Sequence, residues 1–181
     1  MRYAQIRELD ISNGEGVGVA LFVQGCHFHC YNCFNSDTWN FNGGKEWTQE
    51  TEDKLIELAN KPYIKRLSIL GGEPLADENL DGILHLVNRF RLSFPNKSIW
   101  IYSGYSWNQV MSPVITDDFN PNRDELLYKR KEIVKKCNVM VDGRYIDSKR
   151  DITLKWRGSS NQRVINIRKS LEKNKIILYC D

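Results

Sequence analysis

Residues 24–34 read Gln24-Gly25-Cys26-His27-Phe28-His29-Cys30-Tyr31-Asn32-Cys33-Phe34, and the rest of the chain is organised around this stretch. It holds three of the five cysteines, with three residues between Cys26 and Cys30 and two between Cys30 and Cys33. Closely spaced thiolates of this kind hold iron–sulfur centres or zinc. Because no fourth cysteine is nearby, a bound cluster would keep one coordination position open. The spacing therefore predicts a reactive metal centre whose ligands are Cys26, Cys30 and Cys33.

An apolar run of strand length, residues 19–23, leads directly into the cysteine stretch, and strands and helices alternate after it. Such alternation is typical of parallel sheets with helical crossovers. Four or five strands cannot close an eight-stranded barrel, so the pattern predicts an α/β fold: a partial (incomplete) β/α barrel with a mostly parallel sheet, in a single domain spanning residues 1–181. The strands expected are 19–23, 66–70, 98–102 and 138–141, with a further apolar run at 176–179; helices are expected over 48–61, 80–90 and 124–136.

Composition excludes several functions. The net charge of +3 over 181 residues is too small for a nucleic-acid binder, which needs a strongly basic face. No run is long and apolar enough to cross a bilayer, and the N-terminus lacks the core of a secretion signal, so no membrane association and a cytoplasmic location are expected. In that compartment clustered cysteines indicate metal binding rather than disulfides. Cys137 and Cys180 stand apart and receive no role.

A second motif, Gly71-Gly72-Glu73-Pro74, follows the strand predicted over 66–70. Because parallel strands end at the same edge of a sheet, this segment and the cysteine stretch are expected to lie close together. Two adjacent glycines allow a ligand to approach the backbone where any Cβ would obstruct it. The two motifs together predict a ligand site at that edge.

The three-cysteine motif paired with Gly-Gly-Glu-Pro resembles the radical S-adenosylmethionine (SAM) enzymes. Within that superfamily the chain looks like the family that activates anaerobic ribonucleoside-triphosphate reductases. The closer resemblance covers most of the chain and rests on 10–16, 22–26, 35–39, 64–66, 141–144 and 156–162.

The resemblance implies a 4Fe–4S cluster on Cys26, Cys30 and Cys33, with SAM bound to the fourth iron. One electron, from a donor such as flavodoxin, would cleave SAM to methionine and a 5′-deoxyadenosyl radical. In the family this radical takes a hydrogen atom from a glycine of the large, glycyl-radical subunit of anaerobic ribonucleotide reductase. The protein's own contribution would be binding, orientation and exclusion of water.

The resemblance also implies further site residues. Gly71, Gly72 and Glu73 would hold the methionine moiety, with Glu73 accepting charge-assisted hydrogen bonds from its ammonium group. The backbone of Asn32, Cys33 and Phe34 would contact the adenine; Asn32 stands where many members carry an aromatic residue. Ser103 would bond the ribose or the carboxylate, and Asp142 would shape the radical pocket.

Two other functions stay open at this point. The chain could be another short radical SAM enzyme, either a pyruvate formate-lyase activase or a synthase acting on a small molecule. Alternatively, His27 or His29 could complete a structural zinc site with the cysteines. The stretch 156–162 contains no motif of known chemistry, and it could form a polar rim, dock the reductase or be a loop anchored by Trp156.

Overall fold

The computed structural model describes residues 1–111 and 120–180. Its strands are β1 (Arg2–Asp10), β2 (Gly18–Val23), β3 (Lys45–Glu46), β4 (Arg66–Gly71), β5 (Ser98–Ser103), β6 (Val139–Asp142), β7 (Arg163–Asn166) and β8 (Leu178–Cys180). Its helices are α1 (Gln49–Ala59), α2 (Leu80–Ser93), α3 (Trp107–Met111), α4 (Pro121–Lys136) and α5 (Ile167–Lys173), with short 3₁₀ turns η1 (Ser36–Thr38), η2 (Asp77–Asn79) and η3 (Asp147–Lys149). In this part of the chain no helix has the length and apolar character needed to cross a membrane.

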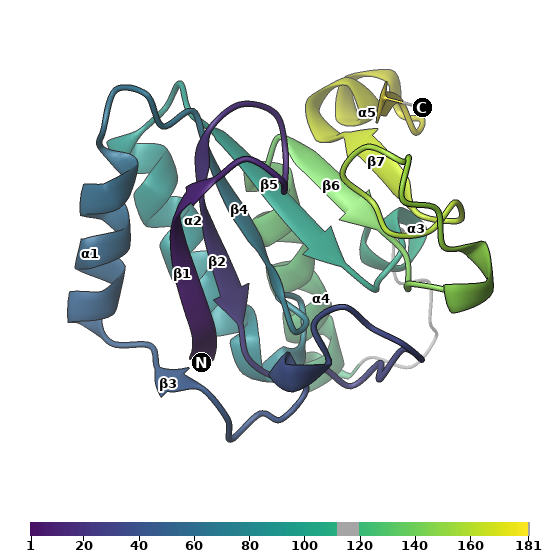
Figure 1. The fold of residues 1–181 in the computed structure, drawn as a ribbon, viewed down its shortest axis with the longest axis horizontal. Helices are drawn as coiled ribbons and strands as arrows, with labels where there is room; N and C mark the ends of the chain where they lie inside the picture. Colours follow the sequence, from purple (N-terminus) through teal and green to yellow (C-terminus); the bar gives the residue numbers. More distant parts are fainter. Residues whose placement is uncertain (112–119, 181) are drawn as a thin grey trace.

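All eight strands belong to one open sheet, ordered β3-β1-β2-β4-β5-β6-β7-β8 (Figure 1). The four central strands, β2, β4, β5 and β6, are parallel, and they are the four strands that the sequence predicts. The α/β class and the parallel centre of the sheet are therefore confirmed. The flanking pairs are antiparallel.

The strand count expected from the sequence was too low. Strand β1 pairs with β2, and β7 and β8 extend the other edge. Along β1 most side chains are partly or fully exposed, so its sequence lacks the apolar run that marks a strand buried on both faces. Strand β3 has only two residues, too few to leave a pattern, whereas β8 overlaps the apolar run expected at 176–179.

The crossover helices α1, α2 and α4 lie on the same face of the sheet (Figure 1). Their first turns carry the signals expected of helix starts: the side chain of Thr48 caps α1 by accepting from the Thr51 amide, and that of Asn120 caps α4 by accepting from the Arg123 amide. Apolar side chains of these helices pack on alternate residues of the central strands, such as Leu21, Ile69 and Ile101, and form the main core.

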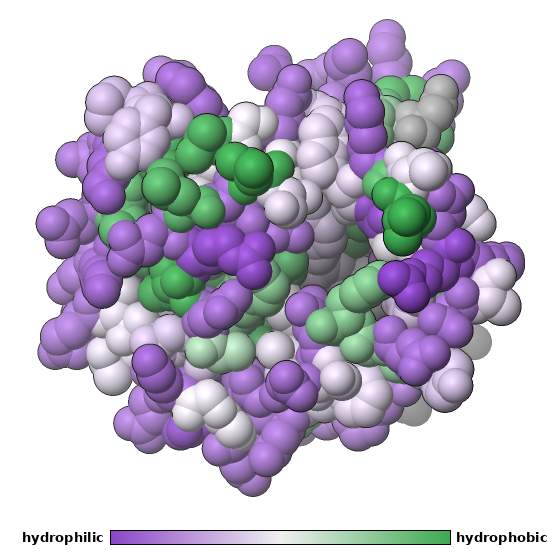
Figure 2. Space-filling model, viewed as in Figure 1, coloured by the Kyte–Doolittle hydropathy of each residue, from purple (hydrophilic) through white to green (hydrophobic). Residues whose placement is uncertain are grey.

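The other face of the sheet carries no crossover helix. Its apolar side chains form two smaller clusters, one around Trp100, Val139 and Val141 and one around Phe22 and Leu70. Figure 2 shows that the molecule is hollowed near the middle of this view, with hydrophilic residues around the hollow. The sheet thus leaves an apolar floor open on the face opposite the helices.

Candidate functional site

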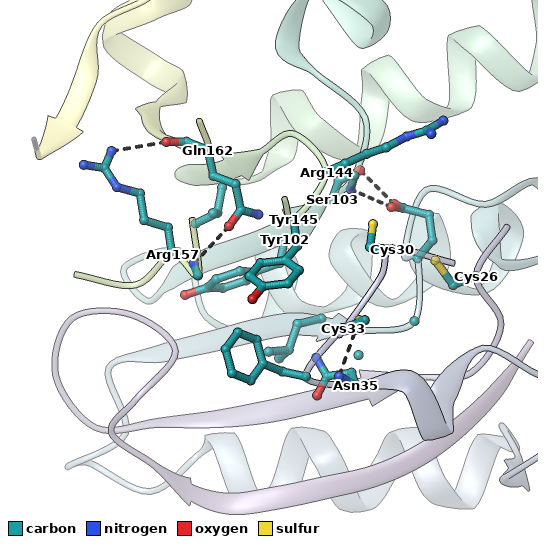
Figure 3. Close-up of a pocket in the computed structure, with 18 of the residues that line it drawn as sticks. Cys26, Cys30, Cys33, Asn35, Tyr102, Ser103, Arg144, Tyr145, Arg157 and Gln162 are labelled. Carbon is teal, nitrogen blue, oxygen red and sulfur yellow. Dashed lines mark hydrogen bonds between the residues drawn. The ribbon is translucent and has the colours of Figure 1, made fainter. Parts of the chain in front are cut away.

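A cavity of about 470 Å³ lies at the carboxyl ends of the parallel strands and extends along the open face of the sheet. Phe22, Leu70, Tyr102 and Val141, from the four parallel strands, contribute to its floor. Of the predicted site residues, all but Asn32 and Asp142 line it: Cys26, Cys30, Cys33, Phe34, Gly71, Gly72, Glu73 and Ser103. Figure 3 shows the three cysteines on one side of this space and Tyr102, Tyr145 and Arg157 on the other.

The three cysteines are half-buried and are not joined by disulfides. Burial raises the pKa of the Cys26 and Cys30 thiols, and nearby backbone N–H groups oppose this rise: those of Phe28 and His29 at Cys26, and that of Tyr145 at Cys30. The Asn35 amide donates to Cys33 Sγ over 3.4 Å. N–H donors aimed at sulfur are a known feature of iron–sulfur sites, where they stabilise the thiolate ligands. The set of donors therefore fits a cluster held by three cysteines.

The arrangement does not resemble a closed zinc site. Within residues 1–111 and 120–180, no three His, Cys, Asp or Glu side chains converge as the ligands of a single ion do. His27 Nε2 lies 2.9 Å from a Glu78 carboxylate oxygen, and the His29 ring stacks on Trp39 with their centres 4.7 Å apart. Cysteines spread around a cavity suit a cubane cluster, because each thiolate binds a different iron.

The Gly71-Gly72 segment is bonded directly to the start of the cysteine loop. The amides of Gly72 and Glu73 donate to the carbonyls of Val23 and Gly25 over 2.9 and 2.7 Å. Gly71 has φ = +105°, and a Cβ on Gly72 would lie 2.4 Å from the Gly25 carbonyl oxygen. Both positions therefore require glycine for the backbone packing itself, in addition to any contact with a ligand.

Glu73 is 2 % exposed, and its carboxylate is held by three donors. Oε1 accepts from the Leu75 amide over 2.9 Å and from the Ser103 hydroxyl over 2.7 Å, and Oε2 accepts from the Gly104 amide over 2.7 Å. Burial raises the pKa of Glu73 to about 7 despite these donors. The structure thus pairs Ser103 with Glu73, and Glu73 keeps acceptor capacity toward the cavity.

The residues predicted to contact adenine separate in the structure. Asn32 is exposed, has φ = +53° and is not among the residues that line the cavity. Phe34 lines the cavity and packs on Tyr145 with ring centres 5.3 Å apart. Asn35, which the motif did not single out, also lines the cavity.

The loop between β6 and β7 forms a wall of the cavity. It includes the stretch 156–162, for which a polar rim was one of the options that the sequence left open, and residues before it that no motif indicated. Arg144, Tyr145, Leu154, Trp156 and Arg157 from this loop line the cavity. Gln162 fastens the wall: its Oε1 accepts from the Gly158 amide over 2.9 Å, and its Nε2 donates to the Gly143 carbonyl over 2.9 Å.

Asp142, expected to shape the pocket, instead holds elements together. It is buried, accepts from the Trp107 amide at the start of α3 over 2.7 Å, and forms an ion pair with Arg163 at 2.5 Å. It is not among the lining residues, whereas the neighbouring Val141 and Gly143 are. Its contribution to the site is therefore the placement of the strand end.

At the far end of the cavity, Ser12 and Asn13 are supported by a buried ion pair. Arg66 and Asp10 have side chains with no solvent exposure, and Arg66 Nη2 lies 2.7 Å from Asp10 Oδ2. The Asn13 amide donates to the same carboxylate over 3.0 Å, and Arg66 also donates to Ser68 Oγ over 2.7 Å. This network joins residues 10–16, which include the lining residues Ser12 and Asn13, to Arg66, which is distant in sequence.

Residues 12–165 match a family model described as a 4Fe-4S single cluster domain, a range that contains every lining residue except Arg7. Proteins named anaerobic ribonucleoside-triphosphate reductase-activating protein from Salmonella typhi and Escherichia coli (strain K12) are each 39% identical over 170 residues, covering 93% of this chain and 100% of the relative. The protein of that name from Enterobacteria phage T4 is 34% identical over 166 residues, covering 91% of this chain and 93% of its own length.

The chain belongs to the family of anaerobic ribonucleoside-triphosphate reductase-activating proteins. Membership in this family confirms the closer resemblance, which was drawn from stretches along most of the chain. The family model's single 4Fe-4S cluster also agrees with the donor set around the cavity, and it gives no support to the zinc alternative.

Proposed function

We propose that this protein, as one radical SAM domain over residues 1–181, activates an anaerobic ribonucleoside-triphosphate reductase by generating a glycyl radical on its large subunit. The observation that supports this most is that one cavity brings the three cysteines together with Gly71, Gly72 and Glu73. The open sheet would act as an incomplete β/α barrel whose uncovered face admits a segment of the partner protein.

Cys26, Cys30 and Cys33 would hold a 4Fe–4S cluster through three of its irons. The chemistry supplied there, once the cluster and SAM are bound, is reductive cleavage of the sulfonium to methionine and a 5′-deoxyadenosyl radical. The glycine of the reductase would then give up a hydrogen atom, leaving its own radical and 5′-deoxyadenosine. The electron would come from a protein donor such as flavodoxin in the cytoplasm.

The chain's own residues would bind and orient SAM. Glu73 would receive the ammonium group, because a cation beside a buried carboxylate restores the charged form that burial disfavours. Gly71 and Gly72 would let the methionine moiety approach the backbone. Phe34 and Asn35 face the cavity and would contact the adenine, whereas Asn32 could contribute only through its backbone.

Anaerobic reconstitution tests the proposal. The protein should bind close to four iron and four sulfide per chain, and with dithionite and SAM it should release methionine and 5′-deoxyadenosine. Adding the large reductase subunit should produce a glycyl-radical signal in electron paramagnetic resonance. Cys30→Ser is the matched control and should lose all three results. A protein that binds one zinc and no iron would contradict the proposal.

The same experiment separates the remaining alternative, another short radical SAM enzyme. Such an enzyme would also cleave SAM. It would form no radical on the reductase and would instead act on pyruvate formate-lyase or on a small molecule.

A further inference from the structure

Arg144 is a cation on the cavity wall without an anionic partner. It follows Gly143 at the end of β6, is exposed, and lines the cavity together with Cys30. Two other arginines near the site are paired with carboxylates, Arg7 with Asp10 at 3.2 Å and Arg163 with Asp142 at 2.5 Å, whereas Arg157 donates to the Gln162 carbonyl over 3.3 Å. Among the residues that the structure describes, no carboxylate or carbonyl receives a hydrogen bond from the Arg144 guanidinium.

Both ends of this residue are held in place. The Arg144 carbonyl accepts from Asn161 Nδ2 over 2.8 Å, which anchors its backbone to the 156–162 stretch. Its guanidinium carbon lies 4.3 Å from the centre of the Phe28 ring, a cation–π contact. Phe28 is itself fixed by Tyr105, with ring centres 4.9 Å apart. The positive charge is therefore oriented before anything binds.

Its platform lies within the cysteine stretch, because Phe28 stands between Cys26 and Cys30 in sequence. The Arg144 guanidinium is therefore held against the loop that carries the cysteines. Arg144, the next residue Tyr145, and Cys30 all line the same cavity.

A positive charge and N–H donors near cluster thiolates favour the reduced form, which carries one more negative charge. We propose that the Arg144 guanidinium, held on Phe28 within the cysteine stretch, raises the reduction potential of the cluster through its positive charge. The proposal depends on the proposed function in one respect, namely that the three cysteines hold a 4Fe–4S cluster. Through this residue, the β6–β7 loop would control how readily the site accepts its electron.

A redox titration followed by electron paramagnetic resonance tests the proposal, with reconstituted wild-type protein, Arg144→Gln and Arg144→Lys. Arg144→Gln should shift the midpoint potential to a more negative value, whereas Arg144→Lys should stay close to the wild type because it keeps the charge. Arg168→Gln, which removes an exposed charge on α5 paired with Glu172, should leave the potential unchanged. Metal-free wild type and Arg144→Gln should unfold at the same temperature.

Equal potentials in wild type and Arg144→Gln would overturn the proposal. Equal shifts in the Gln and Lys variants would also overturn it, because they would show that shape rather than charge matters. Loss of the cluster from Arg144→Gln alone would assign Arg144 a structural role and overturn it as well. A wild type that binds no cluster would instead refute the proposed function, so the two failures are distinguishable.

Discussion

Replacing Asp10 by Asn should destabilise the protein strongly, because it leaves Arg66 as a buried cation without a counter-charge. Both side chains are fully buried, and the 2.7 Å contact between them is supported by the Asn13 amide and by Ser68. Breaking a buried ion pair by removing one partner costs about 3–5 kcal/mol. For a chain of this length, a loss of 1 kcal/mol lowers the melting temperature by about 2–4 °C, so a fall of roughly 6–20 °C is expected.

Urea unfolding of the cluster-free protein, followed by far-ultraviolet circular dichroism, measures this loss. The double variant Asp10→Leu with Arg66→Met is the matched control, and it should recover much of the stability because an apolar pair of similar volume needs no counter-charge. Arg168→Gln, an exposed charge, should change little. A loss below about 1 kcal/mol for Asp10→Asn would refute the reasoning, since it would place the pair in the range of exposed ion pairs.

Four further outcomes are expected. Burial acts to raise the pKa of Asp10, but the hydrogen bonds from Arg66 and Asn13 outweigh burial and lower that pKa. The stability that Asp10 contributes should therefore be complete above the ordinary Asp pKa of about 4 and should disappear as the pH falls through the lower pKa of the folded state. Urea unfolding of Asp10→Asn at a series of pH values should lack this component. Glu73→Gln should leave the Gly104 amide without an acceptor, lose about 1–3 kcal/mol and weaken SAM binding in calorimetry; unchanged values in both would contradict the role given to Glu73. Gly72→Ala should impair both stability and iron content, because its Cβ meets the backbone carbonyl of Gly25 and not a flexible side chain, and a normal iron-to-protein ratio would disprove this. Cys33→Ser should retain the wild-type circular dichroism spectrum but lose bound iron, and retention of four irons would exclude Cys33 as a ligand.

The sequence was most informative where burial or chemistry left a dense signal. Strands buried on both faces, such as β2 with residues 19–23, appear as unbroken apolar runs, and the cysteine spacing defines its own site. The pair Gly71-Gly72 indicated the edge of the sheet where a ligand would bind, and the structure adds that close backbone packing also requires glycine at both positions. These features are local, so a single stretch of sequence is enough to indicate them.

The β6–β7 wall could not be found in this way, because its residues gain their role from partners far along the chain. Arg144 and Tyr145 reach Cys30 only once the sheet brings β6 beside β5. Similarly, Asp10 and Arg66 each look like an exposed charge in sequence, and only their pairing makes burial affordable. Asn32 illustrates a different limit: the motif indicates a backbone contact with adenine, and the structure adds that Asn32 is exposed, with a left-handed backbone.

The wall also has a bearing on biosynthesis. The three cysteines leave the ribosome early, whereas Arg144 and Tyr145, which line the cavity with Cys30, are translated more than a hundred residues later. A nascent chain therefore exposes its three ligand thiols before the wall that shelters them exists. Delivery of iron and sulfide should accordingly be productive only after synthesis is finished, and fragments that stop short of residue 143 should be poor acceptors even though they contain every cysteine ligand.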